Sequence, residues 1–426
     1  MGENQFENNI IDQLEKSGYL RRFYNKKHYD VDCALDKEFF INFIKDTQHK
    51  TWNELKSYLG TDPQEKILLE LENALEKNGV LWVLRNEISI SNKKFRCFYK
   101  KPTSDMNPEL HELYKKNILS VMNQVYFDRK HSVDLVIFIN GIPIITIELK
   151  NSLTKNNVFD AIEQYKSNTR DPSNPLFSFK KRTVAHFAVD EYEVYMTTKI
   201  QGEDTKFTPF NKGWKKGKGN PPNKPYQTEY LWGEILQPIS LMELLSDFVI
   251  LKKEIVKKTE SEKMIFPRYH QLRAVRKILD HTKNHGRGQS YLIEHAPGGG
   301  KSNTISWLSS KLYSLFDEKN DSVFNSVIVI SDKLVIQGQL SKDIRQVNPT
   351  PKLVKEPDTG AELLEILENT DGIIISTQQK FQPILEKIGQ IKNKKFAIII
   401  DEAHSSQGGH GTQSVRAMLT SVLEKI

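Results

Sequence analysis

A glycine-rich segment followed by lysine and serine has the composition of a phosphate-binding loop. It reads Glu294-His-Ala-Pro-Gly-Gly-Gly-Lys-Ser302. Glycines let backbone N–H groups approach phosphates closely, and the N-terminus of a following helix favours negative charge. The strict pattern has glycine where this chain has His295, and a glycine-rich turn without a ligand is the alternative. We expect nucleotide binding by Gly298, Gly299, Gly300, Lys301 and Ser302. In this site Lys301 reaches the β and γ phosphates, and the Ser302 hydroxyl holds Mg²⁺.

Two adjacent carboxylates end an apolar segment about a hundred residues later, in Phe396-Ala-Ile-Ile-Ile-Asp-Glu-Ala-His404. We expect Asp401 to bind Mg²⁺ and Glu402 to activate the water that attacks the γ-phosphate. Two solvated acids at the end of a strand are the alternative. The phosphate-binding loop upstream disfavours that alternative, because together the two segments supply both parts of an ATP site.

A second set of residues, Asp134, Glu148 and Lys150, could cleave phosphodiester bonds. Glu148 and Lys150 are two positions apart in a Val- and Ile-rich segment, so they share one face of a strand. Two carboxylates can hold Mg²⁺ against a phosphate, while a lysine orients water and stabilises charge on phosphate oxygens. The D…E-x-K pattern alone is loose, but ionisable groups in such apolar surroundings are costly without a partner or a metal.

A β-hairpin must align these carboxylates. Residues 133–139 and 142–149 are strand-like and flank Asn140-Gly141, a typical hairpin turn. A simple two-residue turn would set Asp134 opposite Ile147, so that Asp134 and Glu148 would face opposite ways. We therefore predict a bulge or a three-residue loop, with Gly141 at positive φ. Carboxylates on opposite faces would exclude the metal site.

A basic segment at 208–226 contains lysine, glycine and proline but no acidic residue, which is typical of an exposed loop. It is either a solvated surface loop or a loop that contacts DNA phosphates, with Trp214 available to stack on a base. The DNA-contact hypothesis names Lys212, Lys215, Lys216 and Lys218.

Apolar periodicity predicts the remaining elements. Helices are expected at 63–77, 110–124 and 234–256, and the charged stretch that follows indicates a linker. Short apolar strands at 290–294, 327–331, 372–376 and 396–400 alternate with helical segments, which favours an α/β fold with a parallel sheet.

Composition narrows the class of protein. The chain has 426 residues, enough for two to four domains, with 38% hydrophobic and 27% charged residues, a soluble globular balance. The net charge of +7 permits a polyanionic partner. No apolar stretch approaches the roughly 20 residues of a membrane span, and the polar N-terminus does not resemble a secretory signal. Two cysteines without CxxC spacing suggest neither disulfides nor zinc, so we expect a reducing cytoplasm.

The two ATP-site segments resemble a superfamily-2 helicase motor of the DEAH-box kind, which implies a RecA-like domain using ATP and Mg²⁺. In that family Gln271, within Phe266-Pro-Arg-Tyr-His-Gln271, would read adenine. Ser331-Asp332-Lys333 and Ser376-Thr377-Gln378 fall where the family contacts the DNA backbone, a weaker match. A complete motor also needs a second RecA-like domain, and none is visible before Ile426. We therefore expect a truncated chain or a fragment that binds nucleotide weakly and does not translocate.

The nuclease segment resembles the R subunit of type I restriction–modification enzymes. The segments that carry this resemblance are Asn140-Gly-Ile-Pro-Ile-Ile-Thr-Ile-Glu-Leu-Lys-Asn151, Thr205-Lys-Phe-Thr-Pro-Phe-Asn-Lys-Gly213, Gly219-Asn-Pro-Pro222 and Tyr230-Leu-Trp232. The resemblance implies a PD-(D/E)xK nuclease in which Asp134, Glu148 and Lys150 are catalytic and the carboxylates bind Mg²⁺. It also implies double-stranded DNA as substrate and separate methyltransferase (M) and specificity (S) subunits as partners.

One departure concerns the helix after the nuclease strand. Relatives often carry a glutamine four residues before a tyrosine, whereas this chain has Ala161 before Tyr165. The adjacent Gln164 is a possible substitute.

The sequence thus predicts an endonuclease domain with a mixed sheet at 1–256, a linker at 257–265 and a first RecA-like domain at 266–426. The predicted function is that of an ATP-dependent type I restriction endonuclease R subunit. A stand-alone superfamily-2 helicase or remodelling ATPase with a non-catalytic DNA-binding N-terminal domain is one alternative, and an assembly or DNA-docking module without enzymatic activity is another. Lys150 argues against a pure binding domain, which has no need for E-x-K beside an aligned aspartate.

Overall fold

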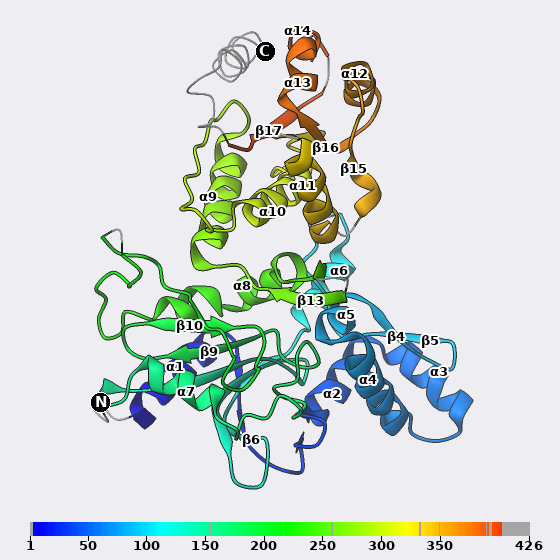
Figure 1. Ribbon diagram of the computed structural model, residues 1–426. Helices are drawn as coiled ribbons and strands as arrows, with labels where there is room; N and C mark the ends of the chain where they lie inside the picture. The colour runs from blue at the N-terminus through cyan, green and yellow to red at the C-terminus, as the bar shows by residue number, and fades with distance from the viewer. Residues whose placement is uncertain are drawn as a thin grey trace. The chain divides into compact units, whose positions relative to one another are not determined.

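Two units, each built around its own β-sheet, make up the chain (Figure 1). The computed structural model describes residues 3–402 apart from 105, 153–154, 216, 257–258, 332–333, 349, 389 and 392–393. The first unit comprises residues 1–102 and 107–269, and the second comprises 103–106 and 270–426. None of the described helices is both long and apolar enough to cross a membrane.

The first unit contains a seven-stranded mixed sheet with the order β1-β6-β7-β8-β9-β10-β11. The pairs β1/β6 and β8/β9 are parallel, and the other neighbours are antiparallel. The strands are β1 (Leu20–Phe23), β6 (Leu119–Tyr126), β7 (Ser132–Ile139), β8 (Ile142–Leu149), β9 (Ala185–Val189), β10 (Val194–Thr197) and β11 (Thr208–Pro209).

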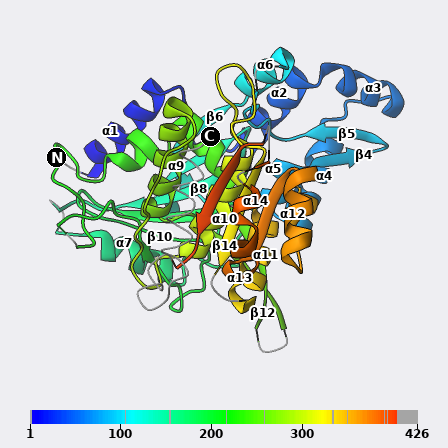
Figure 2. The same ribbon diagram turned by 90° about the horizontal axis from the view of Figure 1, so that it is seen from above.

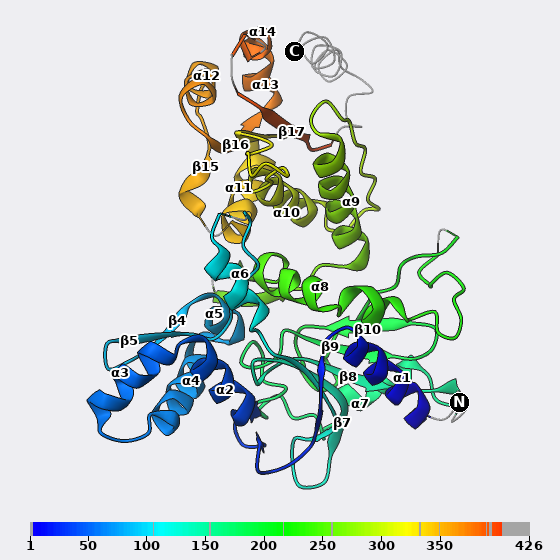
Figure 3. The same ribbon diagram turned by 180° about the vertical axis from the view of Figure 1, so that it is seen from behind.

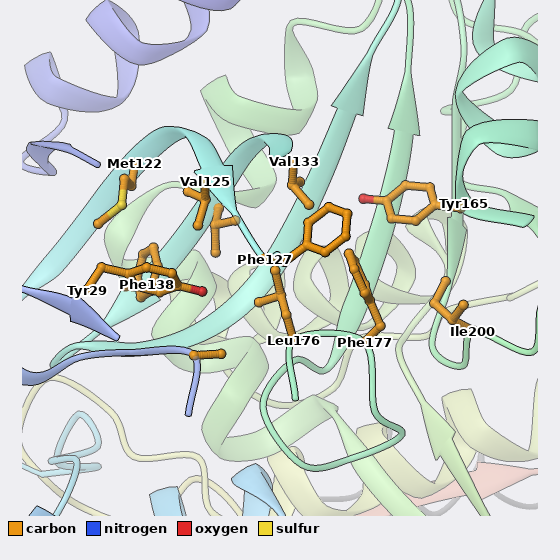
Figure 4. Packing of buried hydrophobic residues seen from close by; sticks show 12 residues of the cluster. Tyr29, Met122, Val125, Phe127, Val133, Phe138, Tyr165, Leu176, Phe177 and Ile200 are labelled. Carbon is orange, nitrogen blue, oxygen red and sulfur yellow. The ribbon is translucent and has the colours of Figure 1, made fainter. Parts of the chain in front are cut away.

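Strand β8 lies in the interior of this unit, because all eight of its residues are buried. A strand buried on both faces is apolar along its whole length, which explains the run of isoleucines around Glu148. Helix α7 (Val158–Lys166) packs against β8 and β9. Figure 4 shows the aromatic packing on this face, where the rings of Phe127, Phe177 and Tyr165 lie side by side.

Helices and short hairpins complete the first unit, and α2 to α5 form a group of their own (Figure 3). Helix α2 begins at a cap in which the Asp36 carboxylate accepts a hydrogen bond from the backbone N–H of Phe39. The elements are α1 (Glu3–Lys16), β2 (Tyr29–Asp30), β3 (Leu35–Asp36), α2 (Lys37–Thr47), α3 (His49–Leu59), α4 (Gln64–Asn78), α5 (Val80–Arg85), β4 (Glu87–Ile90), β5 (Lys93–Arg96), α6 (Pro108–Lys115), η2 (Leu231–Ile235), α8 (Pro238–Glu243), η3 (Leu244–Phe248), β12 (Ile250–Val256) and β13 (Thr259–Ile265).

Three sequence predictions in this unit are wrong in part. The helix expected at 110–124 ends at Lys115, and residues 119–126 form β6 because they pair with both β1 and β7. The helix expected at 234–256 gives way to a strand at Ile250. The described residues of the expected linker at 257–265 form β13, which pairs with β12 in an antiparallel hairpin.

The second unit contains a four-stranded sheet with the order β15-β16-β14-β17, and all its strands are parallel. Figure 2 shows β17 beside β14. The strands predicted at 327–331, 372–376 and 396–400 are confirmed. The elements are α9 (Tyr269–His285), α10 (Lys301–Tyr313), β14 (Ser326–Ser331), α11 (Leu334–Val347), η4 (Pro351–Leu353), β15 (Val354–Lys355), α12 (Gly360–Asn369), β16 (Gly372–Thr377), α13 (Gln378–Phe381), η5 (Gln382–Ile384), α14 (Leu385–Ile388) and β17 (Phe396–Ile400).

The strand predicted at 290–294 is not formed. These residues have no strand partner, and Leu292 is 76% exposed. The hydroxyl of Tyr291 instead forms hydrogen bonds of 2.9 Å with His281 and 3.1 Å with Thr282, both on α9. These contacts hold the segment against the helix and away from a strand position. The predicted α/β class is nevertheless confirmed, with a mixed sheet followed by a parallel sheet flanked by helices.

Candidate active site

The β7–β8 hairpin has the register that the spacing of its carboxylates requires. Asn140 and Gly141 have φ values of 50° and 77°, and the turn pairs Ile139 with Ile142. A bulge then shifts the register, so that Leu135 pairs with Ile147. One step further along, Asp134 lies opposite Glu148. The prediction of a bulge with Gly141 at positive φ is confirmed.

Glycine is required at position 141 by space as well as by φ. A Cβ atom there would lie 2.2 Å from the backbone oxygen of Asp36 and 2.7 Å from the backbone nitrogen of Phe40. The backbone N–H of Asp36 donates to the Gly141 carbonyl at 2.9 Å, so the turn is fixed against the start of α2.

Asp134 and Glu148 lie close together on the same face of the hairpin. The Asp134 carboxylate accepts a hydrogen bond of 2.7 Å from the backbone N–H of Leu149. Glu148 is fully buried. Burial raises the pKa of Glu148 well above its usual value, and the nearby charge of Asp134 raises it further. Carboxylates on opposite faces, which would have excluded the site, are therefore ruled out.

Arg170 is the cationic partner of Glu148, and the sequence analysis did not identify it. Its Nε and Nη2 atoms both donate to Glu148 Oε1, at 3.1 Å and 2.6 Å. Nη2 also donates to the backbone oxygen of Ser132 at 3.0 Å, and the guanidinium lies 5.0 Å from the centre of the Phe127 ring. The arginine is itself only 3% exposed. No periodicity or motif links two residues 22 positions apart, so the sequence held no signal for this pair.

The other oxygen of Glu148 fits a cation. Oε2 is buried and receives no hydrogen bond from the described residues. A buried acceptor without a donor is costly, and a divalent cation shared with Asp134 would satisfy it. The described residues contain no cluster of three His, Cys, Asp or Glu side chains with metal-site geometry. The donor set here is therefore two carboxylates, which suits Mg²⁺ because it usually keeps several waters.

A third carboxylate, Glu7 of α1, is coupled to this pair and was also missed by the sequence analysis. The side-chain amide of Gln124 donates to Glu7 Oε2 at 2.9 Å and to Asp134 Oδ1 at 3.3 Å. Burial raises the pKa of Glu7, and the charge of Asp134 adds to this rise. The N-terminal helix is thus tied to the carboxylate pair.

Tyr165, on helix α7 after β8, joins a buried hydrogen-bond network. Thr146 Oγ1 lies 2.7 Å from the Tyr165 hydroxyl and 2.7 Å from His186 Nδ1. Burial lowers the pKa of His186 to about 3, so the imidazole is neutral. Ala161, which stands where relatives often have glutamine, is fully buried in a small apolar cluster. The polar contact to Glu148 comes from Arg170.

Lys150 follows β8, and its backbone N–H donates to the carbonyl of Val189 at 2.9 Å. Glu191 accepts hydrogen bonds from the side chain of Asn151 at 3.3 Å and from the backbone of Ser152 at 3.2 Å. These contacts fix the chain immediately after the lysine.

The basic loop gives its lysines different surroundings. The Lys212 ammonium pairs with Glu234 at 3.0 Å and lies over the rings of Tyr230 and Tyr269, so this lysine anchors the loop. Lys215 and Lys218 are exposed, as is Trp214. Lys216 lies outside the described residues.

The residues of the second unit that the sequence predicts to bind nucleotide converge at the start of α10. Gly298 and Gly300 have φ values of 73° and 79°, and the helix begins at Lys301, followed by Ser302. The Lys301 ammonium lies 3.1 Å from Asp401 Oδ1 and also pairs with Glu402. Both acids raise the pKa of Lys301, against the lowering effect of burial.

Gln271, which the sequence predicts to read adenine, lies near the same loop. Its side-chain amide donates to the carbonyl of Gly300 at 2.9 Å. Ser331 and Thr377 end the neighbouring strands β14 and β16. Asp332, Lys333, Ala403 and His404 lie outside the described residues.

Comparisons with known families agree with this geometry. Residues 1–205 match the family model of the type I restriction enzyme R protein N terminus. Residues 270–424 match the model of the SWI2/SNF2 ATPase. The RecA-like class predicted for the second unit agrees with this match, which also implies the use of ATP.

Curated relatives extend the similarity over most of the chain. A protein of Methanocaldococcus jannaschii described as a type I restriction enzyme endonuclease subunit, MjaVIIIP, is 23% identical over 94% of this chain and 39% of its own length. The HindI endonuclease subunit of Haemophilus influenzae is 26% identical over 66% of this chain and 26% of its own length. A Staphylococcus aureus type I restriction enzyme endonuclease subunit is 22% identical over 96% of this chain and 40% of its own length.

This chain therefore spans less than half of each of these relatives. The match of residues 1–205 and the three relatives agree with the carboxylate hairpin of the first unit, and the ATPase match agrees with the glycine-rich loop of the second unit. The chain joins an N-terminal domain of the type I restriction enzyme R protein to a SWI2/SNF2 ATPase domain.

Proposed function

We propose that this chain supplies the nuclease centre and a nucleotide-binding motor domain of an ATP-dependent type I restriction endonuclease that cuts double-stranded DNA. The nuclease is assigned to the first unit and the motor to the second. The observation that carries the proposal is the bulged hairpin, which aligns Asp134 with Glu148 and leaves a buried carboxylate oxygen without a donor. A domain that only binds DNA has no use for this costly arrangement.

In the proposed reaction, Asp134 and Glu148 would hold Mg²⁺, which would polarise the scissile phosphate. Lys150 orients the attacking water and stabilises the charge that grows on the phosphate oxygens. Gln124 keeps Asp134 in place from one side, and the backbone N–H of Leu149 does so from the other. The apolar residues around β8 exclude further water, which strengthens these electrostatic interactions.

The second unit is proposed to bind ATP with Mg²⁺ through the loop Gly298 to Ser302. Asp401 would hold the cation, Glu402 would activate the hydrolytic water, and Gln271 would read the adenine. The contact of Lys301 with both acids supports this assignment, because the phosphates of a bound nucleotide would pair with the lysine and leave the acids for Mg²⁺.

DNA is proposed to run along the basic loop, where Lys215 and Lys218 meet phosphates and Trp214 stacks on a base. Lys216 belongs to the same proposal by its position in the sequence, whereas Lys212 supports the loop from within. Specificity and methylation would come from separate S and M subunits in the cytoplasm, in line with the relatives' description as endonuclease subunits.

The test uses the enzyme reconstituted with the proposed M and S subunits. ATP hydrolysis and cleavage of unmethylated circular DNA are measured for the wild type, Lys150→Ala and Lys301→Ala. We expect Lys150→Ala to hydrolyse ATP but not to cut, and Lys301→Ala to lose both activities. Cleavage that survives Lys150→Ala would refute the nuclease assignment and favour a DNA-binding N-terminal domain.

A further inference from the structure

The buried partner of Glu148 suggests a role that the proposed nuclease chemistry does not yet assign. Arg170 gives two hydrogen bonds to one oxygen of Glu148 and none to the other. A bidentate arginine usually grips both oxygens of a carboxylate, one with each nitrogen. Here the grip on Oε1 alone leaves Oε2 buried and without a donor.

We infer that Arg170 is a positioning residue that fixes the Glu148 carboxylate, so that Oε2 is presented to the divalent cation shared with Asp134. This inference rests on the proposed nuclease function. In this role Arg170 would act only through the carboxylate that it holds, and not by touching the cation or DNA itself.

The surroundings of Arg170 are built to hold it still. Nη2 donates to the carbonyl of Ser132 on β7 and to Glu148 on β8, so the guanidinium joins the two strands that carry the carboxylates. Nη1 donates to Thr169 Oγ1 at 3.0 Å, and the ring of Phe127 covers one face of the guanidinium. Every nitrogen of the guanidinium therefore has a partner.

Charge alone predicts the opposite effect on cation binding. A guanidinium near a divalent cation repels it, so removal of the positive charge should tighten binding if charge were the only contribution. If orientation dominates, removal of Arg170 frees the carboxylate to turn and weakens binding. Loss of a residue that orients a metal ligand typically costs about 10- to 100-fold in metal affinity.

The experiment measures Mn²⁺ binding by electron paramagnetic resonance with the full 426-residue chain, without nucleotide. All variants carry Asp401→Asn, which removes the carboxylate proposed to bind the cation of the motor. Arg170→Met removes both hydrogen bonds to Glu148. Arg170→Lys keeps the positive charge, but an ammonium group cannot reproduce the planar two-nitrogen contact of the guanidinium. Arg182→Met is the matched control, because Arg182 is also fully buried and charge-paired but contacts Glu76 and the Cys33 carbonyl.

We expect the Mn²⁺ dissociation constant to rise about tenfold or more in Arg170→Met, to rise less in Arg170→Lys, and to stay unchanged in Arg182→Met. Unchanged or tighter binding by a folded Arg170→Met would overturn the inference. If that variant does not fold, Arg170→Lys decides, and wild-type affinity in Arg170→Lys would overturn the inference equally.

The Asp134→Asn variant separates this inference from the proposed function. If Asp134→Asn abolishes Mn²⁺ binding while Arg170→Met leaves it intact, only the role of Arg170 is wrong. If the parent chain binds no Mn²⁺, or if Asp134→Asn binds it normally, the proposed metal site itself is wrong, and the role of Arg170 is wrong with it.

Discussion

Asp134→Asn should abolish DNA cleavage and yet leave the first unit as stable as before or slightly more stable. Asp134 lies opposite the buried Glu148, and its charge raises the pKa of that carboxyl. Such repulsion is useful only when a cation lies between the two carboxylates. Functional sites commonly hold strain of this kind at a cost to stability.

The magnitude follows from the geometry of the pair. Directly opposite residues of an antiparallel pair have Cβ atoms about 4.5–5.5 Å apart. When both groups are ionised, two unit charges at that separation repel by roughly 3–4 kcal/mol at an effective dielectric constant of about 20. Asp134 is partly exposed and Arg170 offsets part of the Glu148 charge, so we retain about half, or ~2 kcal/mol.

The substitution also weakens the two hydrogen bonds that Asp134 accepts, chiefly the short one from Leu149. The Leu149 N–H now donates to a carboxylate and would donate to a neutral amide oxygen, a loss of about 1 kcal/mol. The net expectation is a gain of between 0 and about 1 kcal/mol in the free energy of unfolding, where an average substitution costs about 1 kcal/mol. Cleavage should fall at least about a hundredfold, because the proposed metal ligand is lost.

Urea unfolding followed by tryptophan fluorescence measures the stability, and nicking of circular DNA by the reconstituted enzyme measures the activity. Asp36→Asn is the control, because Asp36 is fully buried and its carboxylate is paired with Arg22, which also pairs with Glu38. That variant should lose roughly 1–3 kcal/mol. A loss of more than about 1 kcal/mol in Asp134→Asn, or near-normal cutting, would contradict the reasoning.

Four further substitutions test the hairpin, the buried carboxyl and the basic loop. Gly141→Ala should lower the free energy of unfolding by roughly 2–4 kcal/mol, because the new Cβ clashes with the backbone and φ is positive. Gly60→Ala is the control, since Gly60 has a similar φ but open space around it, and it should lose only about 1–2 kcal/mol. Equal losses would mean that the close contact with Asp36 is unimportant. Because the folded-state pKa of Glu148 lies above that of the unfolded chain, the ionised form disfavours folding, and stability falls as pH rises from about 4.5 through the raised pKa. The stability of Glu148→Gln relative to wild type should therefore increase between pH 5 and pH 8, as measured by urea titrations at each pH. His186 is present in both proteins, so its contribution cancels in this difference in stability. A difference that stays constant with pH would argue against the raised pKa. Lys215→Ala and Lys218→Ala should each reduce the slope of log affinity for DNA against log salt concentration by about 0.9. Lys101 is an exposed lysine outside the loop, so Lys101→Ala should leave this slope unchanged. An unchanged slope in the two loop variants would show that the loop does not contact DNA phosphates.

The alignment of Asp134 with Glu148 could be predicted because it is a matter of counting. Side chains alternate along a strand, so one extra residue between the turn and the site decides which face each carboxylate takes. The three confirmed strands of the second unit were equally accessible, since each is a short apolar segment bounded by polar residues. Local composition contains this kind of information.

The errors share a different cause, because tertiary contacts decided them. Residues 119–124 fit helical spacing, yet they are held as a strand by partners on both sides. Residues 290–294 are apolar enough for a strand, but the hydroxyl of Tyr291 is bonded to α9. Arg170 and Glu7 reach the site from 22 and more than 100 positions away in sequence, distances at which no local pattern operates.

The Asn140 turn explains how a fold of this kind can hold two repelling carboxylates in register. The Asn140 side chain accepts from the backbone N–H of Ile118 at 2.7 Å and donates to the carbonyl of Cys97 at 2.9 Å. Gly141 is held in turn by Asp36 at the start of α2. A strand pair could relieve the repulsion by slipping one residue, which would turn Glu148 to the opposite face. Because Ile118, Cys97 and Asp36 all hold the turn, the hairpin resists slipping and the bulge persists. The two carboxylates therefore stay opposite each other, and a cation bound between them would relieve their repulsion.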